Sequence, residues 1–336
     1  MSEIAMIADV HVEKNKNLPH VIECCKWVGD VLFERKIKKL FVLGDFINSR
    51  IKIDSLVLSS AIEILEYWSS KDIEVVLLLG NHELYYKENR LDESEVTSIK
   101  PFKKFCKVVE HYESIEVYNT IIHLMPWITD LKKYREVLES ADVKKDDIIM
   151  SHTEVLGSVL NGISNIKDTS GLPSSMFKVK TFLGHYHKRQ KFYIGSPLSL
   201  NFGEASEEKG ITIFNCESKE TEFIQNPKSE IYKTILFDDY KDDDNFENSY
   251  FIRILLTKKI SENNKAQIID HFNKINKQVI FKPIYSEESQ ETIEVKENSL
   301  LEMMREYIEK YSNDLDKEKL YDIGKDFYER KYSNVL

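Results

Sequence analysis

Short apolar runs alternate with segments of helical periodicity in the first part of the chain. Ile4–Ala8, Leu40–Leu43 and Val75–Leu79 are continuous apolar runs of the length of a buried strand. Between them, Leu18–Lys36 and Asp54–Ser70 repeat apolar residues every three or four positions, as one face of a helix does. This alternation predicts a layered domain in which helices cover a sheet.

Short strand-like runs predominate from residue 121 onward. They lie at Ile121–Met125, Ile148–Met150, Thr181–Leu183, Phe192–Ile194 and Ile211–Phe214. The segment 157–175 is rich in Gly, Ser, Asn and Thr, and this composition predicts a long loop. We therefore expect an α+β domain over residues 1–226.

The pattern changes after Asn226-Pro227, where a smaller module is predicted over residues 228–292. Three strand-like runs and one helical run lie there, at 229–238, 250–257, 263–276 and 278–285. Acidic and polar residues at 287–297 indicate a linker. The last segment, 298–336, has two apolar helical faces, formed by Leu300, Leu301, Met304, Ile308 and Tyr311 and by Leu320, Ile323 and Phe327.

Polar segments with metal-binding side chains follow the apolar runs of the first domain. They read Asp9-Val10-His11, Gly44-Asp45, Gly80-Asn81-His82-Glu83, Ser151-His152 and Gly184-His185-Tyr186-His187. Ligand sites of open α/β sheets assemble at the carboxyl ends of the strands. Each segment alone has a plain structural explanation as a turn, but all five together in this order predict a site with two metal ions.

The residue types fit such a site. Two divalent ions about 3.5–4 Å apart need a shared carboxylate, for which Asp45 is the candidate. Imidazoles suit first-row metals, and Asn81 offers an amide oxygen while the adjacent His82 points elsewhere. Residues two apart share a face of an extended segment, so we expect Asp9 and His11 to project together, and His185 and His187 likewise.

The five segments resemble the motifs of the calcineurin-like metallophosphoesterase superfamily, which run D-x-H, G-D, G-N-H-[DE], H and G-H-x-H. A further stretch, Gly195-Ser196-Pro197 to Phe202-Gly203-Glu204 with Lys209-Gly210, resembles the G-S-P…F-G-E…K-G segment of SbcD-type nucleases. The resemblance covers roughly residues 1–215. It implies a four-layer αββα sandwich with a small α+β capping, DNA-contacting domain and C-terminal helices.

The resemblance also assigns roles to residues. One ion would be held by Asp9, His11, Asp45 and His187, and the other by Asp45, Asn81, His152 and His185. His82 would be a catalytic residue that is not a ligand, and Glu83 beside it either orients that imidazole or is a helix-start carboxylate. The expected metal is manganese, two Mn²⁺ ions, with Mg²⁺ as a possible substitute. The chain departs from the family pattern at Val12-Glu13, Asn48 and Leu79.

The function implied is a two-metal DNA nuclease, with double-strand exonuclease and single-strand endonuclease activity, that processes DNA ends in recombination, repair or phage replication. An SbcC-type coiled-coil ATPase is the implied partner, because the chain has no Gly-x-x-x-x-Gly-Lys-Ser/Thr motif of its own. Residues 298–336 would dock on it, or else pack on the chain's own second module. Homodimerisation is expected too, through Leu18–Lys36 or Lys100–Tyr112.

Other functions share these metal motifs. A small-molecule phosphodiesterase would need neither a partner nor the C-terminal helices. A protein Ser/Thr phosphatase would read G-D-x-V-D-R-G at the second motif, but Gly44–Arg50 lacks the second Asp and the final Gly. A non-catalytic scaffold is disfavoured by the complete ligand set.

Charge and composition add two points. The net charge of −10 runs against the basic surface common in DNA-binding proteins, although two bound ions would add about four positive charges. Candidate DNA contacts are Lys100, Lys103, Lys104 and Lys107, which are spaced as on one helix face, together with Lys188 and Arg189; the lysines also fit a plain surface helix. The absence of long apolar runs, of a signal-peptide pattern and of a cysteine framework predicts a cytoplasmic protein, in the host cytoplasm if its source is a phage.

Overall fold

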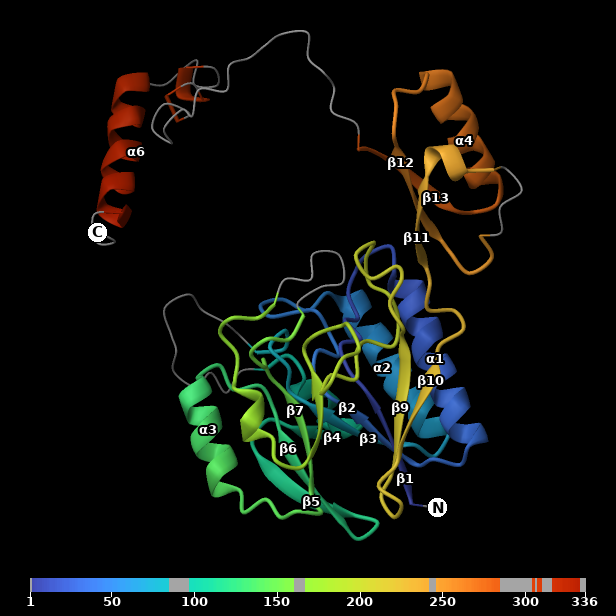
Figure 1. Ribbon diagram of the computed structural model, residues 1–336, viewed down its shortest axis with the longest axis vertical. Coiled ribbons are helices and arrows are strands. Elements are labelled where there is room, and N and C mark those ends of the chain that lie inside the picture. Colours follow the sequence, from blue (N-terminus) through green and yellow to red (C-terminus); the bar gives the residue numbers. More distant parts are fainter. Residues whose placement is uncertain are drawn as a thin grey trace. The chain divides into compact units, whose positions relative to one another are not determined.

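The computed structural model describes residues 2–84, 97–159, 167–241 and 246–284, and in the C-terminal part 304–305, 307–309 and 316–332 (Figure 1). The chain divides into two compact units, Met1–Tyr285 and Ser286–Leu336. We describe each unit by itself.

A six-stranded sheet forms the centre of the first unit. Four strands run parallel in the order β1-β2-β3-β4, and β9 and β10 extend the sheet antiparallel beyond β1. The bounds are β1 Glu3–Ile7, β2 Lys39–Val42, β3 Glu74–Leu78, β4 Lys107–Val109, β9 Gly210–Asn215 and β10 Thr221–Gln225. The three apolar runs predicted as strands near the N-terminus are thus strands, each shifted by about one residue.

A second sheet of four strands packs against the first. It is ordered β5-β6-β7-β8, with bounds Glu113–Val117, Thr120–Met125, Ile148–His152 and Lys180–Gly184. β6, β7 and β8 are parallel, and β5 joins β6 through a tight hairpin. The hairpin residues Tyr118 (φ 49°) and Asn119 (φ 58°) both have positive φ, the backbone that matches the twist of a two-residue turn.

Helices cover the outer faces of the two sheets, which gives four layers (Figure 1). α1 (Leu18–Glu34) and α2 (Ser55–Ser70) pack on the six-stranded sheet, and α3 (Leu131–Ser140) packs on the other. Alternate strand residues serve different layers: Ile7 packs toward the helices, whereas Met6 packs between the sheets. The predicted α+β sandwich is therefore confirmed.

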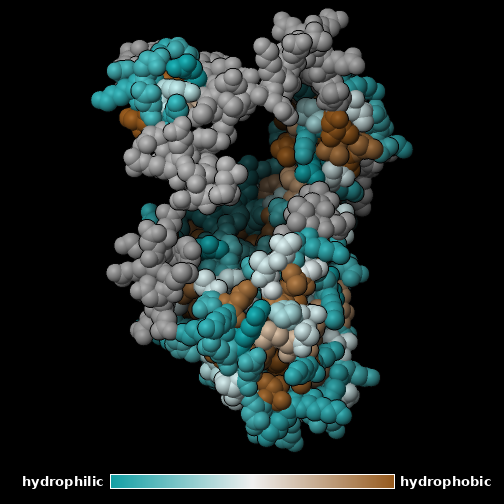
Figure 2. Space-filling model, turned by 60° about the vertical axis from the view of Figure 1, so that its left-hand side comes forward, coloured by the Kyte–Doolittle hydropathy of each residue, from teal (hydrophilic) through white to brown (hydrophobic). Residues whose placement is uncertain are grey.

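A small α+β module follows the sandwich in the same unit. Its parallel sheet is ordered β11-β12-β13, with bounds Tyr232–Leu236, Phe251–Leu256 and Gln278–Pro283, and α4 (Glu262–Lys274) packs on one face. The Tyr232 hydroxyl donates to Asn17 Oδ1 of the sandwich at 2.6 Å. Figure 2 shows hydrophobic atoms on the surface of this module, where Leu236, Ile269, Ile275, Ile280 and Ile284 are exposed. The predicted elements are present, and the boundary at residues 226–228 stays a prediction.

Two expectations about secondary structure are wrong. Phe192–Ile194 is not a strand but makes a single bridge, between Tyr193 and Leu183. The lysines from Lys100 do not share a helix face, because Lys100–Lys104 is a short 3-10 helix and Lys107 begins β4. The β-branched pair Val108-Val109 favours the strand that follows, whereas Pro101 lies in the first turn of the 3-10 helix, where proline is tolerated. Two further 3-10 helices lie at Ser174–Met176 and Phe237–Asp239.

In the second unit, α6 spans Lys317–Tyr332. It contains the second predicted apolar face, whereas the linker at 287–297 and most of the first face lie outside the described residues. Among the helices that the structure describes, none has the length and apolar character needed to cross a membrane.

Candidate metal centre

The five polar segments meet at one edge of the sandwich. The first three follow the carboxyl ends of β1, β2 and β3, and His152 and Gly184 are the last residues of β7 and β8. Because these strands are parallel within their sheets, their ends carry the segments to the same side. Backbone hydrogen bonds join the loops, from Asp9 N to Gly44 O at 3.1 Å and from His11 N to Asp45 O at 2.9 Å.

Four predicted ligands have a strained backbone. Asp9 (φ 55°), His11 (φ 50°), Asp45 (φ 52°) and His185 (φ 107°) all lie at positive φ, where residues with a side chain are uncommon. The backbone at these positions is therefore not extended, as the prediction assumed, although Asp9 and His11 do lie in one group of potential ligands. Such conformations cost about 1–3 kcal/mol each and are typical of functional sites, so the fold holds these side chains in place against local preference.

Three glycines make the close packing of these segments possible. A Cβ atom on Gly44 (φ 85°) would collide with the ring of His152, and one on Gly80 would collide with the carboxylate of Asp45. At Gly184 it would collide with the carbonyl oxygen of Leu43 and with His152. The glycines of the second, third and fifth segments are thus needed for the approach of the side chains.

The side chains form overlapping groups of potential ligands around Asp45. Asp9, His11 and His187 have potential ligand atoms within 4.8 Å of one another, and so do Asp45, His152 and His185, and also His11, Asp45 and His82. Asp45 Oδ2 lies 3.7 Å from His11 Nε2 and 3.4 Å from His152 Nε2, between the groups. The Nε2 atoms of His11 and His187 are 3.1 Å apart.

Asn81 completes the second group. Its Oδ1 lies 3.0 Å from His152 Nε2 and 3.0 Å from His185 Nδ1. With the amide turned over, its NH₂ would donate to both rings and its oxygen would accept from Arg50 Nη2 at 2.8 Å. An ion at this point needs lone pairs from all three residues, so the orientation with Oδ1 toward the rings is the one that suits a cation.

Burial and mutual contact shift the pKa values of the site. Burial raises the pKa of Asp45, but the adjacent His152 and His11 outweigh it and hold that pKa well below its ordinary value. Burial, aided by His187, lowers the pKa of His11 to about 3. Burial also lowers the pKa of His152, but Asp45 and Asp9 outweigh burial and raise this pKa to about 9. Nitrogen and oxygen lone pairs that converge in a buried place fit divalent first-row cations.

His82 lies beside His11 and Asp45, with potential ligand atoms of all three within 4.8 Å of one another. That His82 is a catalytic residue and not a ligand stays a prediction. Its Nε2 lies 3.9 Å from Asp45 Oδ2, and its side chain is 31% exposed, so it faces the mouth of the site. Its Nδ1 lies 2.6 Å from Asn48 Oδ1, and Asn48 Nδ2 donates to Glu13 Oε2 at 2.6 Å. Asn48 and Glu13, two departures from the family pattern, thus orient this imidazole.

Glu83 does not orient the His82 ring, which corrects that interpretation. Its carboxylate is fully buried and accepts hydrogen bonds from the backbone N–H groups of Gly80 (2.8 Å), Ile47 (3.0 Å) and Asp45 (3.1 Å). Burial and the nearby Asp45 raise the pKa of Glu83 to about 8. Residues 81–83 form a turn and Leu84 makes a bridge, and the residues directly after them, where a helix would begin, lie outside the described part of the chain. Through these hydrogen bonds Glu83 links the loop of the second motif to that of the third.

Several neighbours of the ligands had no role in the sequence prediction. Glu154 Oε1 lies 3.3 Å from His185 Nε2, and Trp127 stacks on the His185 ring with centroids 5.1 Å apart. Glu204 Oε1 lies 2.9 Å from His187 Nδ1, and Lys209 contacts Glu204. The signal for Glu204 and Lys209 was the F-G-E…K-G segment, which the resemblance singled out without giving these two residues a role.

The predicted DNA contacts are placed in two regions. Lys103 forms an ion pair with Glu110, and Lys107 forms one with Glu113 at 2.8 Å, so these lysines are engaged with acidic neighbours. Lys100 also has a partner, and Lys104 is exposed. A role for any of them in DNA binding stays a prediction.

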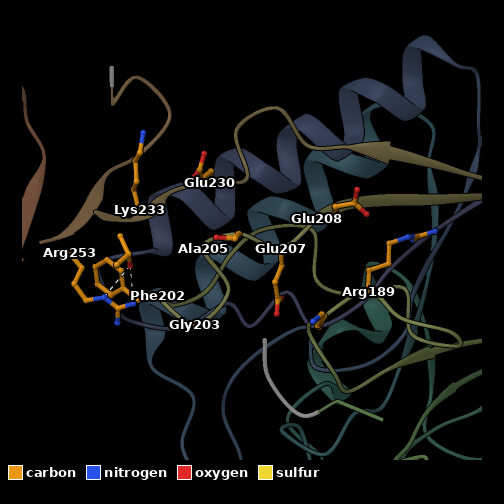
Figure 3. A pocket seen from close by; sticks show the side chains of 12 residues that line it. Arg189, Phe202, Gly203, Ala205, Glu207, Glu208, Glu230, Lys233 and Arg253 are labelled. Carbon is orange, nitrogen blue, oxygen red and sulfur yellow. Dashed lines mark hydrogen bonds between the residues drawn. The ribbon is translucent and has the colours of Figure 1, made fainter. Parts of the chain in front are cut away.

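Lys188 and Arg189 line a cavity of about 520 Å³. Its other walls come from the 202–208 segment and from the small module. Figure 3 shows Arg253 beside Phe202, with Arg189 across the cavity. Arg189 Nη1 donates to Thr212 Oγ1 at 2.8 Å, and its guanidinium lies over the Phe223 ring. The cavity holds both basic and acidic side chains.

The fold and the paired ligand groups define a metal-dependent phosphoesterase. The family model described as Calcineurin-like phosphoesterase matches residues 2–189, which is more than half of the 336 residues. The chain therefore belongs to the calcineurin-like phosphoesterase family. It is also 26% identical over 302 residues to Exonuclease subunit 1 of Enterobacteria phage T4, which covers 85% of each chain.

Solved structures with some likeness to the chain include two phosphatases. A dimetal phosphatase from Danio rerio has 12% identity and a TM-score of 0.37, covering 63% of this chain and 91% of that one. Purple acid phosphatase PPD1 from yellow lupin has 14% identity and a TM-score of 0.37, covering 67% and 46%. At these TM-scores we draw no conclusion from either.

Proposed function

We propose that the protein is a two-metal DNA nuclease that acts on DNA ends. The observation that carries this proposal is the set of overlapping ligand groups around Asp45, beside which stands the partly exposed imidazole of His82. The T4 relative, whose name describes an exonuclease subunit, supports DNA as the substrate.

In this proposal, one ion is held by Asp9, His11, Asp45 and His187, and the other by Asp45, Asn81, His152 and His185. When bound, two such ions supply positive charge to a phosphoryl group and acidify water. We propose Mn²⁺ as the metal, with Mg²⁺ as a substitute, because the donors are nitrogen and oxygen atoms without a thiolate.

His82 is the proposed proton-transferring residue. Its Nδ1 faces the oxygen of Asn48, which accepts a hydrogen bond, so the neutral ring carries its hydrogen on Nδ1. The nitrogen that exchanges a proton with the substrate is then Nε2, on the side of Asp45. Glu83 acts on the same reaction only through the backbone of the two motif loops that it joins.

The proposed partners are DNA, an SbcC-type coiled-coil ATPase and a second copy of this chain. The T4 relative is named as a subunit, which supports a partner. The ATPase would bind the C-terminal unit, which is compact in its own right and contains α6. Lys188 and Arg189 are the proposed contacts to the DNA backbone, since they follow His187 directly in the chain.

The test is the degradation of linear double-stranded DNA by the purified chain with Mn²⁺, Mg²⁺ or a chelator, with Asp45→Ala as control. We expect Mn²⁺-dependent degradation that the variant lacks. A phosphopeptide and a cyclic nucleotide are offered in parallel. Rapid hydrolysis of either, with DNA left intact even when the ATPase is added, would overturn DNA as the substrate and favour a protein phosphatase or a small-molecule phosphodiesterase.

A further inference from the structure

A buried carboxylate lies directly behind His187, on the side away from the other ligands. Glu204 Oε1 is 2.9 Å from His187 Nδ1, and Glu204 is 5% exposed. The other ring nitrogen, Nε2, faces His11 and belongs to the group with Asp9. A carboxylate in this place accepts the Nδ1 hydrogen and leaves Nε2 with its lone pair free.

Lys209 holds this carboxylate in place. Its ammonium group is fully buried and donates to Glu204 Oε2 and Glu207 Oε2, both at 2.9 Å. It also donates to Ser196 Oγ at 2.9 Å and to the carbonyl oxygen of His187 at 2.8 Å. A buried cation is tolerated only when it is paired and hydrogen-bonded, and here four oxygens surround it. Lys209 thus donates hydrogen bonds both to Glu204 and to the backbone of His187, the residue that Glu204 orients.

The loop that contains Glu204 is tied down as well. Leu200 N donates to Glu204 Oε2 at 3.1 Å, and Asn201 Nδ2 donates to Oε1 at 2.7 Å. Asn17 Nδ2 donates to the carbonyl oxygen of Leu200 at 3.0 Å. Both oxygens of the carboxylate are therefore engaged by the protein, and its orientation toward His187 is fixed.

We propose that Glu204, held by Lys209, is a positioning residue of the metal centre that fixes the tautomer of His187. This inference rests on the proposed function, in which His187 is a ligand of one of two ions. It explains the F-G-E…K-G segment, which supplies the carboxylate and the lysine that keep Nε2 of His187 unprotonated and aimed at the ion.

A glutamine could not replace Glu204 in this role. Its single oxygen would face either Lys209 or His187, because both donate to the carboxylate of Glu204. If the amide NH₂ faces His187, it donates to Nδ1, and the ring then carries its hydrogen on Nε2, where the ion must bind. The substitution Glu204→Gln therefore keeps the shape of the side chain while it favours the wrong tautomer.

The test is the titration of chelator-stripped full-length protein with Mn²⁺ by calorimetry. We expect wild type to bind two equivalents, and Glu204→Gln to bind one of them about 10–100-fold more weakly, the usual cost of losing a carboxylate behind a histidine ligand. Glu220→Gln, which removes the same charge from an exposed position between β9 and β10, should bind both ions as wild type does. Two equivalents bound with wild-type affinity by folded Glu204→Gln would overturn the proposal.

A second measurement needs no substitution of Glu204. In chelator-treated wild-type protein at alkaline pH, long-range ¹H–¹⁵N NMR should show the His187 hydrogen on Nδ1, with the signal identified by its loss in His187→Asn. A hydrogen on Nε2 would overturn the proposal even if Glu204→Gln fails to fold. A failure of the proposed function looks different: wild type would then bind no Mn²⁺ if the metal site were wrong, or would bind two equivalents and leave DNA intact if the substrate were wrong.

Discussion

The Nδ1 atom of His82 lies 2.6 Å from Oδ1 of Asn48, so an uncharged amide holds the imidazole at the mouth of the metal centre. The amide is itself held by Glu13, which accepts a hydrogen bond from Asn48 Nδ2 at 2.6 Å. The His82 ring is thus oriented through Nδ1, and metal binding and turnover of a His82 variant can be measured separately.

We predict that His82→Ala keeps its metal and loses its turnover. His82 lies near His11 and Asp45, but its Nδ1 is engaged by Asn48 and its side chain is 31% exposed, so we expect the other ligands to hold the ions without it. Proton transfer by a positioned side chain contributes roughly 10²–10⁴-fold to rate. Mn²⁺ binding by calorimetry and hydrolysis of a generic phosphodiester measure the two quantities separately. Loss of metal together with activity would show that His82 is a ligand.

Replacing Asn48 by Asp should move the pH dependence of the reaction. Burial lowers the pKa of His82, while Asp45 acts against it. A second carboxylate, now at Nδ1, stabilises the charged ring and raises that pKa. The limb of the kcat/KM profile that belongs to His82 should shift to higher pH in Asn48→Asp and stay in place in Asn264→Asp, which changes an exposed amide in α4. An unshifted profile would mean that His82 does not titrate in the reaction.

Substitution of Gly44 should remove metal binding, while that of Gly157 should not. Gly44 (φ 85°) and Gly157 (φ 82°) have nearly the same backbone, so alanine at either position carries about 1–2 kcal/mol of left-handed strain. Only at Gly44 does the new Cβ collide with His152, whereas nothing lies within 4 Å at Gly157. Mn²⁺ titration of both variants checks this, and equal affinities would show that the close packing at Gly44 is unimportant.

Asp168 should stabilise the protein only above acidic pH. Burial raises the pKa of Asp168, but hydrogen bonds from Ser170, Tyr186 and Gly171 outweigh it and place the pKa below its ordinary 3.8. A group with a lowered pKa in the folded state contributes stability above its unfolded pKa, and this contribution is lost as pH falls through the folded pKa. Asp168→Asn should therefore lower the free energy of unfolding by about 1–3 kcal/mol near pH 7.

The measurement for Asp168 is urea unfolding of both proteins, treated with chelator, between neutral pH and pH 3. The difference between wild type and Asp168→Asn should shrink toward the acidic end. A difference that stays constant over this range would mean that the charge of the Asp168 carboxylate contributes nothing to the free energy of unfolding. The effect of the substitution would then come only from the changed side-chain shape.

Removal of residues 298–336 should abolish binding of the ATPase partner and leave Mn²⁺ binding unchanged. The reason is that Ser286–Leu336 forms a unit of its own, so its loss leaves the sandwich and its ligands intact. Co-purification of the shortened and full-length chains with the ATPase checks this. Undiminished partner binding would assign the docking surface to the sandwich or to the small module.

The strands and the identity of the clustered residues could be predicted from the sequence because both follow from local patterns. Apolar runs set β1, β2 and β3, and parallel strands bring the segments that follow them to one edge. The direction of each side chain could not be predicted. The period-two argument for Asp9 and His11 assumed an extended backbone, but the contacts between loops impose a left-handed one.

The partners of the ligands were also beyond sequence analysis, because they come from distant segments. His82 is oriented by Asn48, 34 positions away, and His187 by Glu204, 17 positions away. Glu83 shows the opposite error: adjacency in sequence to His82 favoured a contact with its ring, yet its carboxylate is buried under three backbone N–H groups. The Glu83 side chain points into the loops because their buried backbone N–H groups require a hydrogen-bond acceptor.

Asn17 is the point at which three parts of the first unit meet. It precedes α1, accepts a hydrogen bond from Tyr232 at the start of β11, and donates to the carbonyl oxygen of Leu200, in the loop that leads to Glu204. Two hydrogen bonds at one side chain thus link the small module to the loop that contains Glu204, whose carboxylate contacts His187. A residue far from the ligands in sequence therefore lies only a few contacts away from one of them.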